Sequence, residues 1–260
     1  MTVTTAPIPT RLSDLLSTNG FSEVKAELWA SFVGETVAVL GKAAAELRTT
    51  ESWEAFGQKR GALSKPKKRK RAAVVERIPI EDAITAELGH IARRLRAALP
   101  SDHFLRLQEV AFETEHLVES SERTGRHSRK VDFFIYAQVG DAPPELAIEA
   151  KPLLAKADIV GRYLADEGIG CFFSVDSVYT RQTVAAVLAY TINGDSRPHY
   201  DDIERAMEHF VPTPLTVQPV TLLPMTAPVL CSRHDRSKLQ LDPVTIIHFE
   251  LLFPPEQNPL

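Results

Sequence analysis

The chain has 260 residues, a hydrophobic fraction of 44%, a charged fraction of 25% and a formal net charge of −4 at pH 7. These values are ordinary for a globular protein and exclude a chain that is disordered over most of its length. No apolar run approaches the roughly 18 residues of a membrane helix, and the first residues lack the features of a secretion signal. The two cysteines, Cys171 and Cys231, are too far apart in sequence to suggest a metal-binding pair. The sequence therefore predicts a cytoplasmic protein with no membrane partner.

The first part of the chain is predicted to be helical. Residues 12–60 carry apolar side chains mostly at helical spacing, and Asn19-Gly20 is a typical helix stop. The following run, Lys65–Arg71, has six basic residues in seven and no apolar face. We expect three parts: a helical N-terminal segment (1–64), a basic linker (65–78) and a core domain with C-terminal strands (79–260).

The core begins with a strongly predicted helix over residues 78–100, because Ile84, Leu88 and Ile91 form one apolar stripe. Residues 103–119 are a weaker candidate for a strand. Residues 130–139 and 146–153 are predicted as two strands joined by a short turn, which indicates a β-hairpin.

The remaining elements complete an α/β pattern. They are expected as a helix (155–167), a buried strand (168–177), two helices (180–194 and 200–210) and two strands (227–231 and 244–253). This order predicts an α/β fold with a mixed central β-sheet flanked by helices on both faces.

The hairpin carries the residues that suggest chemistry. Alternation places Asp132 on one face of the first strand, and Glu149 and Lys151 on one face of the second. If the strands pair, the three side chains converge. Two adjacent carboxylates are costly without a cation between them, and Mg²⁺ or Mn²⁺ is suited to such a pair. A lysine there can orient an attacking water and offset developing negative charge, so the set favours phosphodiester hydrolysis.

The spacing of Asp132 and Glu149-Ala150-Lys151 resembles the motif of the PD-(D/E)xK nuclease superfamily. The order of the flanking elements is also similar, and the resemblance covers residues 80–195. Val131 departs from the proline that the family has before the aspartate. The resemblance implies a restriction-endonuclease-like core with a helical N-terminal extension. It further implies a Mg²⁺ or Mn²⁺ ion held by Asp132, Glu149 and the Ala150 carbonyl, with Lys151 assisting the attacking water.

Members of this superfamily often carry a further glutamate on the helix before the hairpin. Glu87 fits that role because it flanks the apolar stripe, and Glu113 and Glu115 are the alternatives. The segment after the hairpin is similar to a pattern in some members that would bring Arg162 and Tyr163 to the site.

The basic residues near the motif are candidates for nucleic-acid binding. Arg126, Arg129 and Lys130 would contact phosphates at the mouth of the site, or form only a charged turn. The basic run would bind the nucleic-acid backbone without reading sequence, or serve only as a solvated linker. Its proposed contacts are Lys67, Lys68, Arg69 and Lys70.

The resemblance implies a metal-dependent nuclease that leaves a 5′-phosphate and a 3′-hydroxyl, with DNA favoured over RNA and endonuclease over exonuclease action. Restriction, repair and phage defence are all compatible, and a homodimer or a larger defence complex is a possible assembly. One alternative is a catalytically silent, nuclease-like module for nucleic-acid binding or assembly. Another is an interaction protein without any nucleic-acid role. The presence of Asp132, Glu149 and Lys151 together favours the enzyme.

Overall fold

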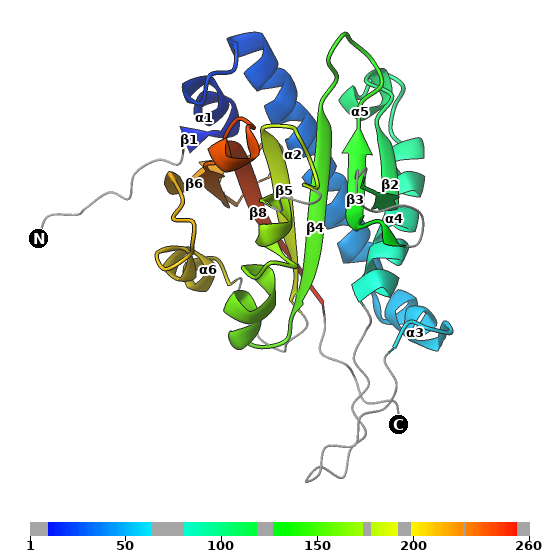
Figure 1. Cartoon of the computed structure of the whole chain (residues 1–260). Helices are drawn as coiled ribbons and strands as arrows, with labels where there is room; N and C mark the ends of the chain where they lie inside the picture. Colours follow the sequence, from blue (N-terminus) through cyan, green and yellow to red (C-terminus); the bar gives the residue numbers. More distant parts are fainter. Residues whose placement is uncertain are drawn as a thin grey trace, which may run out of the picture.

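The computed structural model describes residues 10–63, 81–118, 127–173, 178–191, 199–225 and 227–253. Within these residues an eight-stranded mixed sheet has the order β1-β6-β7-β8-β5-β4-β3-β2 (Figure 1). The strands are β1 (Thr10–Arg11), β2 (Ala111–Leu117), β3 (Lys130–Tyr136), β4 (Glu145–Leu153), β5 (Val184–Thr191), β6 (Thr216–Thr221), β7 (Val229–His234) and β8 (Val244–Leu252). The β1–β6, β4–β5 and β5–β8 pairs are parallel, and the other neighbours are antiparallel.

Helices cover both faces of the sheet, as the sequence predicts. They are α1 (Leu12–Thr18), α2 (Glu23–Leu47), α3 (Thr50–Gln58), α4 (Glu81–Ala97), α5 (Phe104–Leu107) and α6 (Tyr200–Met207), with short turns η2 (Ile159–Tyr163), η3 (Ile169–Phe172) and η4 (Ser237–Leu239). Apolar residues of α1, α2 and α4 form one buried cluster with the sheet. Those of η2, η3 and α6 form a second cluster with it. In Figure 1, α2 passes behind the strands.

The N-terminal helices and the sheet share a core. Trp29 and Phe32 of α2 are at most 2% exposed and belong to the same cluster as Phe133 of β3 and Leu188 of β5. The basic linker expected at residues 65–78, including Lys67–Lys70, lies entirely outside the described residues, so the expected division of the chain stays a prediction. No helix in the described part of the chain is long and apolar enough to cross a bilayer.

Most predicted elements are confirmed: α1 to α3 within residues 12–60, α4, the antiparallel β3–β4 hairpin, α6, β7 and β8. Residues 103–119 are part helix, as α5, and part strand, as β2. Strand β6, which lies next to the edge of the sheet, was not predicted from the sequence.

Three predictions after the hairpin are wrong. The helix expected at 180–194 is strand β5, whose eight residues are all buried. Both faces of β5 are covered, so its sequence has no alternation of polar and apolar residues. An apolar, alanine-rich run of this kind is compatible with either a helix or a strand. The helix expected at 155–167 is reduced to a short segment ending in the π-helical turn η2, and the strand expected at 168–177 contains the 3₁₀ turn η3. Residues Ile169 and Phe172 are buried there without joining the sheet.

Candidate active site

The site begins where β3 and β4 separate. Their ladder runs from Tyr136 opposite Glu145 to Phe133 opposite Ile148, and β4 then continues beside β5 as far as Leu153. Backbone donors on the β3 side of β4 need another partner beyond this point. The Asp132 carboxylate supplies one, because its Oδ2 accepts a hydrogen bond from the Ala150 N–H at 2.7 Å. This bond fixes Asp132 in the fork between the two strands.

The backbone of β2 and β3 is irregular beside Asp132. The β2–β3 ladder pairs Thr114 with Phe133 and His116 with Val131, and it omits Glu115, whose φ is 54°. Val131 belongs to one buried cluster and Phe133 to the other, so the alternation of faces breaks between them. A left-handed residue other than glycine is uncommon and is often found near functional sites. The sequence gives no sign of this irregularity.

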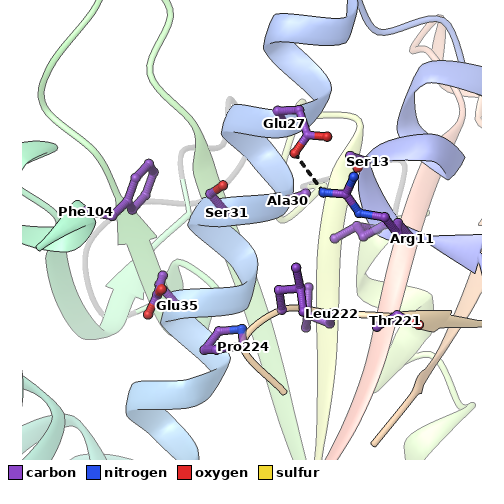
Figure 2. Close-up of a pocket in the computed structure, with 12 residues that line it drawn as sticks. Arg11, Ser13, Glu27, Ala30, Ser31, Glu35, Phe104, Thr221, Leu222 and Pro224 are labelled. Carbon is purple, nitrogen blue, oxygen red and sulfur yellow. Dashed lines mark hydrogen bonds and ion pairs between the residues drawn. The ribbon is translucent and has the colours of Figure 1, made fainter. Parts of the chain in front are cut away.

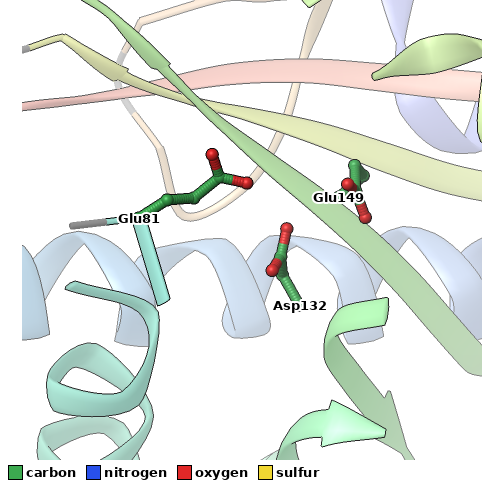
Figure 3. A group of neighbouring side chains, drawn as sticks. All are labelled: Glu81, Asp132 and Glu149. Carbon is green, nitrogen blue, oxygen red and sulfur yellow. The ribbon is translucent and has the colours of Figure 1, made fainter. Parts of the chain in front are cut away.

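Three carboxylates converge on one lysine. Lys151 Nζ lies 2.7 Å from Glu149 Oε1 and 2.5 Å from Glu81 Oε1. Asp132 completes the group, since one oxygen from each of Glu81, Asp132 and Glu149 lies within 4.8 Å of the others. Figure 3 shows the three side chains reaching toward a common space from α4, β3 and β4. We call Glu81, Asp132, Glu149 and Lys151 the acidic cluster.

Burial changes the proton affinities of the cluster. It raises the pKa of Asp132 to about 6, against the opposing effects of the Lys151 charge and the Ala150 N–H. Burial and the charge of Asp132 raise the pKa of Glu149 well above its usual range. Burial also acts to lower the pKa of Lys151, but the charges of Glu149, Glu81 and Asp132 outweigh it, so that pKa is raised. Lys151 is therefore a fixed cation beside two carboxylates, Asp132 and Glu149, that bind protons unusually well.

The cluster fits a divalent cation. Glu149 is 4% exposed, and its Oε2 is buried without a hydrogen-bond partner among the described residues. Such an atom costs free energy unless a donor or a cation approaches it. Hard oxygen donors from three carboxylates suit Mg²⁺ or Mn²⁺. The Ala150 carbonyl lies beside them, since it accepts a 3.0 Å hydrogen bond from Lys151 Nζ. Asp132, Glu149, Glu81 and this carbonyl are the groups that could hold the ion.

Glu81 is the site residue that the sequence interpretation missed. It precedes the buried residues Ile84 and Thr85 by three and four positions, so it lies on the helix face that turns toward the sheet. Thr85 Oγ1 and Tyr190 Oη of β5 are 2.8 Å apart in a buried hydrogen bond, which ties this end of α4 to the sheet. The spacing to Ile84 was the available signal.

Glu87, the glutamate expected in this role, lies elsewhere. Its Oε2 is 2.5 Å from Lys59 Nζ in an ion pair with the region after α3. The two alternatives are also engaged away from the cluster. Glu113 contacts His116 and Tyr136 at 2.7 and 2.8 Å, and Glu115 pairs with Lys130 at 2.7 Å.

The predicted basic contacts are only partly described. Lys130 is engaged by Glu115, as above, and Arg129 lies near η3, where its charge acts on Cys171 and Tyr179. Arg126 and Lys67–Lys70 lie outside the described residues. Arg162 does approach the cluster, with its Nη2 3.7 Å from Glu81 Oε2, and Tyr163 beside it is fully buried.

A cleft away from the acidic cluster lies between α1, α2 and the loop after β6 (Figure 2). Its charged groups are already paired: Arg11 with Glu27 at 3.3 Å, and Glu35 with His103 at 3.5 Å. Among the described residues no group of three carboxylates converges there, so the acidic cluster is the better candidate for chemistry.

Comparisons of this chain with protein-family models, with curated proteins and with solved structures found no match.

Proposed function

We propose that this protein is a metal-dependent nuclease that hydrolyses phosphodiester bonds, with DNA favoured over RNA as substrate. The observation that carries the proposal is the convergence of Glu81, Asp132 and Glu149, two of which pair with Lys151, with Glu149 Oε2 left without a partner among the described residues. A carboxylate set with an adjacent lysine is the arrangement that the PD-(D/E)xK resemblance implies. The preference for DNA and for endonuclease action, and a homodimer or defence complex as the working assembly, rest on that resemblance alone.

The side chains of the acidic cluster would have different roles in the reaction. Asp132, Glu149 and Glu81 would hold the ion, which would supply Lewis-acid activation of the phosphate and of an attacking water. Lys151 is a buried cation with a raised pKa, so it stays protonated at neutral pH and acts as a hydrogen-bond donor. It would orient the water and stabilise negative charge that develops on the phosphate oxygens. Arg129, Lys130 and the basic run would contact more distant phosphates.

The test measures nucleic-acid cleavage by the wild-type protein, by variants of the acidic cluster and by a control variant of α4. Purified protein is incubated with plasmid, linear duplex DNA, single-stranded DNA and RNA, each with Mg²⁺, with Mn²⁺ and with chelator. We expect cleavage that depends on metal and that falls at least about 100-fold in Lys151→Met and Glu81→Gln. Glu87→Gln is the matched control, because Glu87 pairs with Lys59 outside the cluster, and we expect its activity to stay near the wild-type value.

A metal titration separates the enzyme from the silent module. We expect Mn²⁺ to bind the wild-type protein and to bind Asp132→Asn at least about tenfold more weakly. If the wild-type protein neither cleaves nor binds metal, the proposal is wrong. Nucleic-acid binding that persists under those conditions would support the silent binding module instead.

A further inference from the structure

Arg162 stands at the edge of the acidic cluster. Its Nη2 lies 3.7 Å from Glu81 Oε2, while the other oxygen of Glu81 pairs with Lys151. The Arg162 side chain is 38% exposed. Among the residues that the structure describes, no hydrogen bond occupies its guanidinium group. Its N–H donors are therefore available to a ligand that approaches from solvent beside Glu81.

The residue next to it is held by a buried chain of polar groups. Tyr163 Oη lies 3.0 Å from His248 Nδ1 of β8, and His248 Nε2 lies 2.7 Å from Ser232 Oγ of β7. Ser232 Oγ in turn lies 2.7 Å from His234 Nε2. All four residues are at most 1% exposed. The chain of polar groups thus links η2 to strands β7 and β8 and is almost wholly shielded from solvent.

The donor and the acceptor of each hydrogen bond in this buried chain of polar groups can be assigned. Tyr163 donates its hydroxyl hydrogen to the Val187 carbonyl of β5 at 3.1 Å. His248 must then donate from Nδ1 to Tyr163 and accept at Nε2 from Ser232, and His234 donates from Nε2 to Ser232. The only nitrogen left over, His234 Nδ1, is then an acceptor. The reverse order would bury a donor at His234 Nδ1, which has no partner in the described part of the chain.

Both histidines are neutral in this arrangement. Burial lowers the pKa of His234 to about 4, and burial together with the neighbouring His234 lowers the pKa of His248 to about 3. Every hydrogen in the chain therefore has one acceptor, and the tyrosine has one favoured position on the sheet. Since Arg162 directly precedes Tyr163, the anchored ring fixes the backbone from which the Arg162 side chain extends.

The charges at the cluster suit a phosphate once a cation is present. The carboxylates of Glu81, Asp132 and Glu149, when ionised, outnumber the cations of Lys151 and Arg162 by one, so these side chains carry −1. A divalent cation changes that charge to +1. A phosphodiester group carries one negative charge, and a planar guanidinium group can donate to two phosphate oxygens at once.

We propose that Arg162 binds a substrate phosphate beside the acidic cluster and that the buried chain of Tyr163, His248, Ser232 and His234 positions it. This inference rests on the proposed nuclease function. Arg162 is a substrate-binding residue in this scheme, and Tyr163 is a positioning residue that acts through it.

The experiment measures three quantities on each variant: Mn²⁺ affinity, nucleic-acid affinity in Ca²⁺, and KM and kcat in Mg²⁺. Arg162→Gln is expected to weaken nucleic-acid affinity and raise KM about tenfold, because one charge-assisted contact is lost. Its Mn²⁺ affinity should stay the same or increase, since a cation near the ligands is removed. Arg162→Lys should recover part of the loss. The matched control is Lys156→Gln, because Lys156 is an exposed cation nearby that pairs with Asp202.

The positioning role is tested with Tyr163→Phe and, as a second variant that also breaks the chain, Ser232→Ala. Both should raise KM in the same direction as Arg162→Gln and leave Mn²⁺ affinity unchanged. Adding either change to Arg162→Gln should raise KM no further. If KM rises further in the double variants, the chain does not act through Arg162.

The outcomes distinguish the two proposals. If the wild-type protein binds metal and cleaves, but Arg162→Gln keeps the wild-type KM and nucleic-acid affinity, this inference is wrong and the nuclease function stands. If Lys156→Gln weakens binding as much as Arg162→Gln, the effect is one of general charge, and the inference is again wrong. If the wild-type protein binds neither metal nor nucleic acid, both proposals fail.

Discussion

Asp132 makes the stability of the metal-free protein depend on pH. Burial raises its pKa to about 6, compared with the usual 3.8. A carboxyl group that binds protons more tightly when folded stabilises the fold at low pH, and this contribution is lost as pH rises from about 4 to about 6. Above pH 6 the folded protein carries a buried charge that the unfolded chain holds at lower free energy.

Replacing Asp132 by asparagine should therefore stabilise the metal-free protein at high pH only. In urea unfolding with chelator, we expect Asp132→Asn to raise the free energy of unfolding at pH 8, relative to its effect at pH 4, by up to about 3 kcal/mol. Added Mn²⁺ should reverse the order at pH 8, because only the wild-type protein keeps all of its ligands. An effect of Asp132→Asn that is the same at both pH values would contradict this account.

Arg236 shows how the loops beside β5 are held. It is 1% exposed, and its guanidinium group donates to three backbone carbonyls, those of Asp242, Thr180 and Gln182, at 2.8 to 2.9 Å. We expect Arg236→Met to lower the free energy of unfolding by about 3 kcal/mol, because three backbone carbonyls, one of them fully buried, lose a charged donor. Chemical denaturation measures this loss. The exposed Arg181→Met is the control, and an equal loss in both variants would show that the buried bonds are not the cause.

At the scale of elements, α2 depends on a close approach to the loop after β6. A Cβ atom on Gly34 would lie 1.7 Å from the Leu223 carbonyl oxygen, whereas a Cβ on Gly41 of the same helix would meet nothing within 4 Å. We expect Gly34→Ala to lower the free energy of unfolding by about 2 kcal/mol or more. Gly41→Ala should raise it by about 0.5–1 kcal/mol through helix propensity. Thermal and urea unfolding of the pair test this, and two stabilised variants would refute the close contact.

The elements that the sequence predicts well are those whose local pattern or context favours one type of structure. The apolar stripe of α4 and the alternation of β3 each match a single period, so both were predictable. Strand β4 is buried along almost its whole length, and the short turn that joins it to β3 identified it as a hairpin partner. Strand β5 has no wet face, and its Ala-Ala-Val-Leu-Ala run fits either period. Its identity as a strand depends on pairing with β4 and β8, which are distant in sequence.

The residues of the candidate site differ in the same way. Those that depend on a local pattern were predictable, and those that depend on contacts between distant residues were not. Asp132, Glu149 and Lys151 come from one hairpin, so local alternation was enough to bring them together. Glu81 enters from α4 and depends on how that helix docks through Thr85 on Tyr190, a contact between residues 105 positions apart. The left-handed Glu115 and the resulting position of Asp132 depend on neighbouring strands and leave no pattern in the sequence.

At the scale of the whole molecule, the N-terminal helices are built into the main core. Leu16 of α1 and Phe32 and Leu40 of α2 are fully buried in one cluster with Ile135 and Phe249 of the sheet. The short strand β1 also extends the sheet at β6. Removal of these helices would expose a large apolar face of the sheet and of α4.

A chain shortened to residues 79–260 should therefore fail to fold alone. Exposure of that face removes much of the burial that stabilises the sheet, and open apolar surface of this kind promotes aggregation. We expect the fragment to lack a cooperative thermal transition, and the separately produced fragment 1–64 to restore one when both are mixed. Differential scanning calorimetry on each fragment and on the mixture measures this. If residues 79–260 alone unfolded cooperatively near the melting temperature of the full chain, the helices would be a separable extension. The acidic cluster would then have to be held by the sheet and α4 without support from α2.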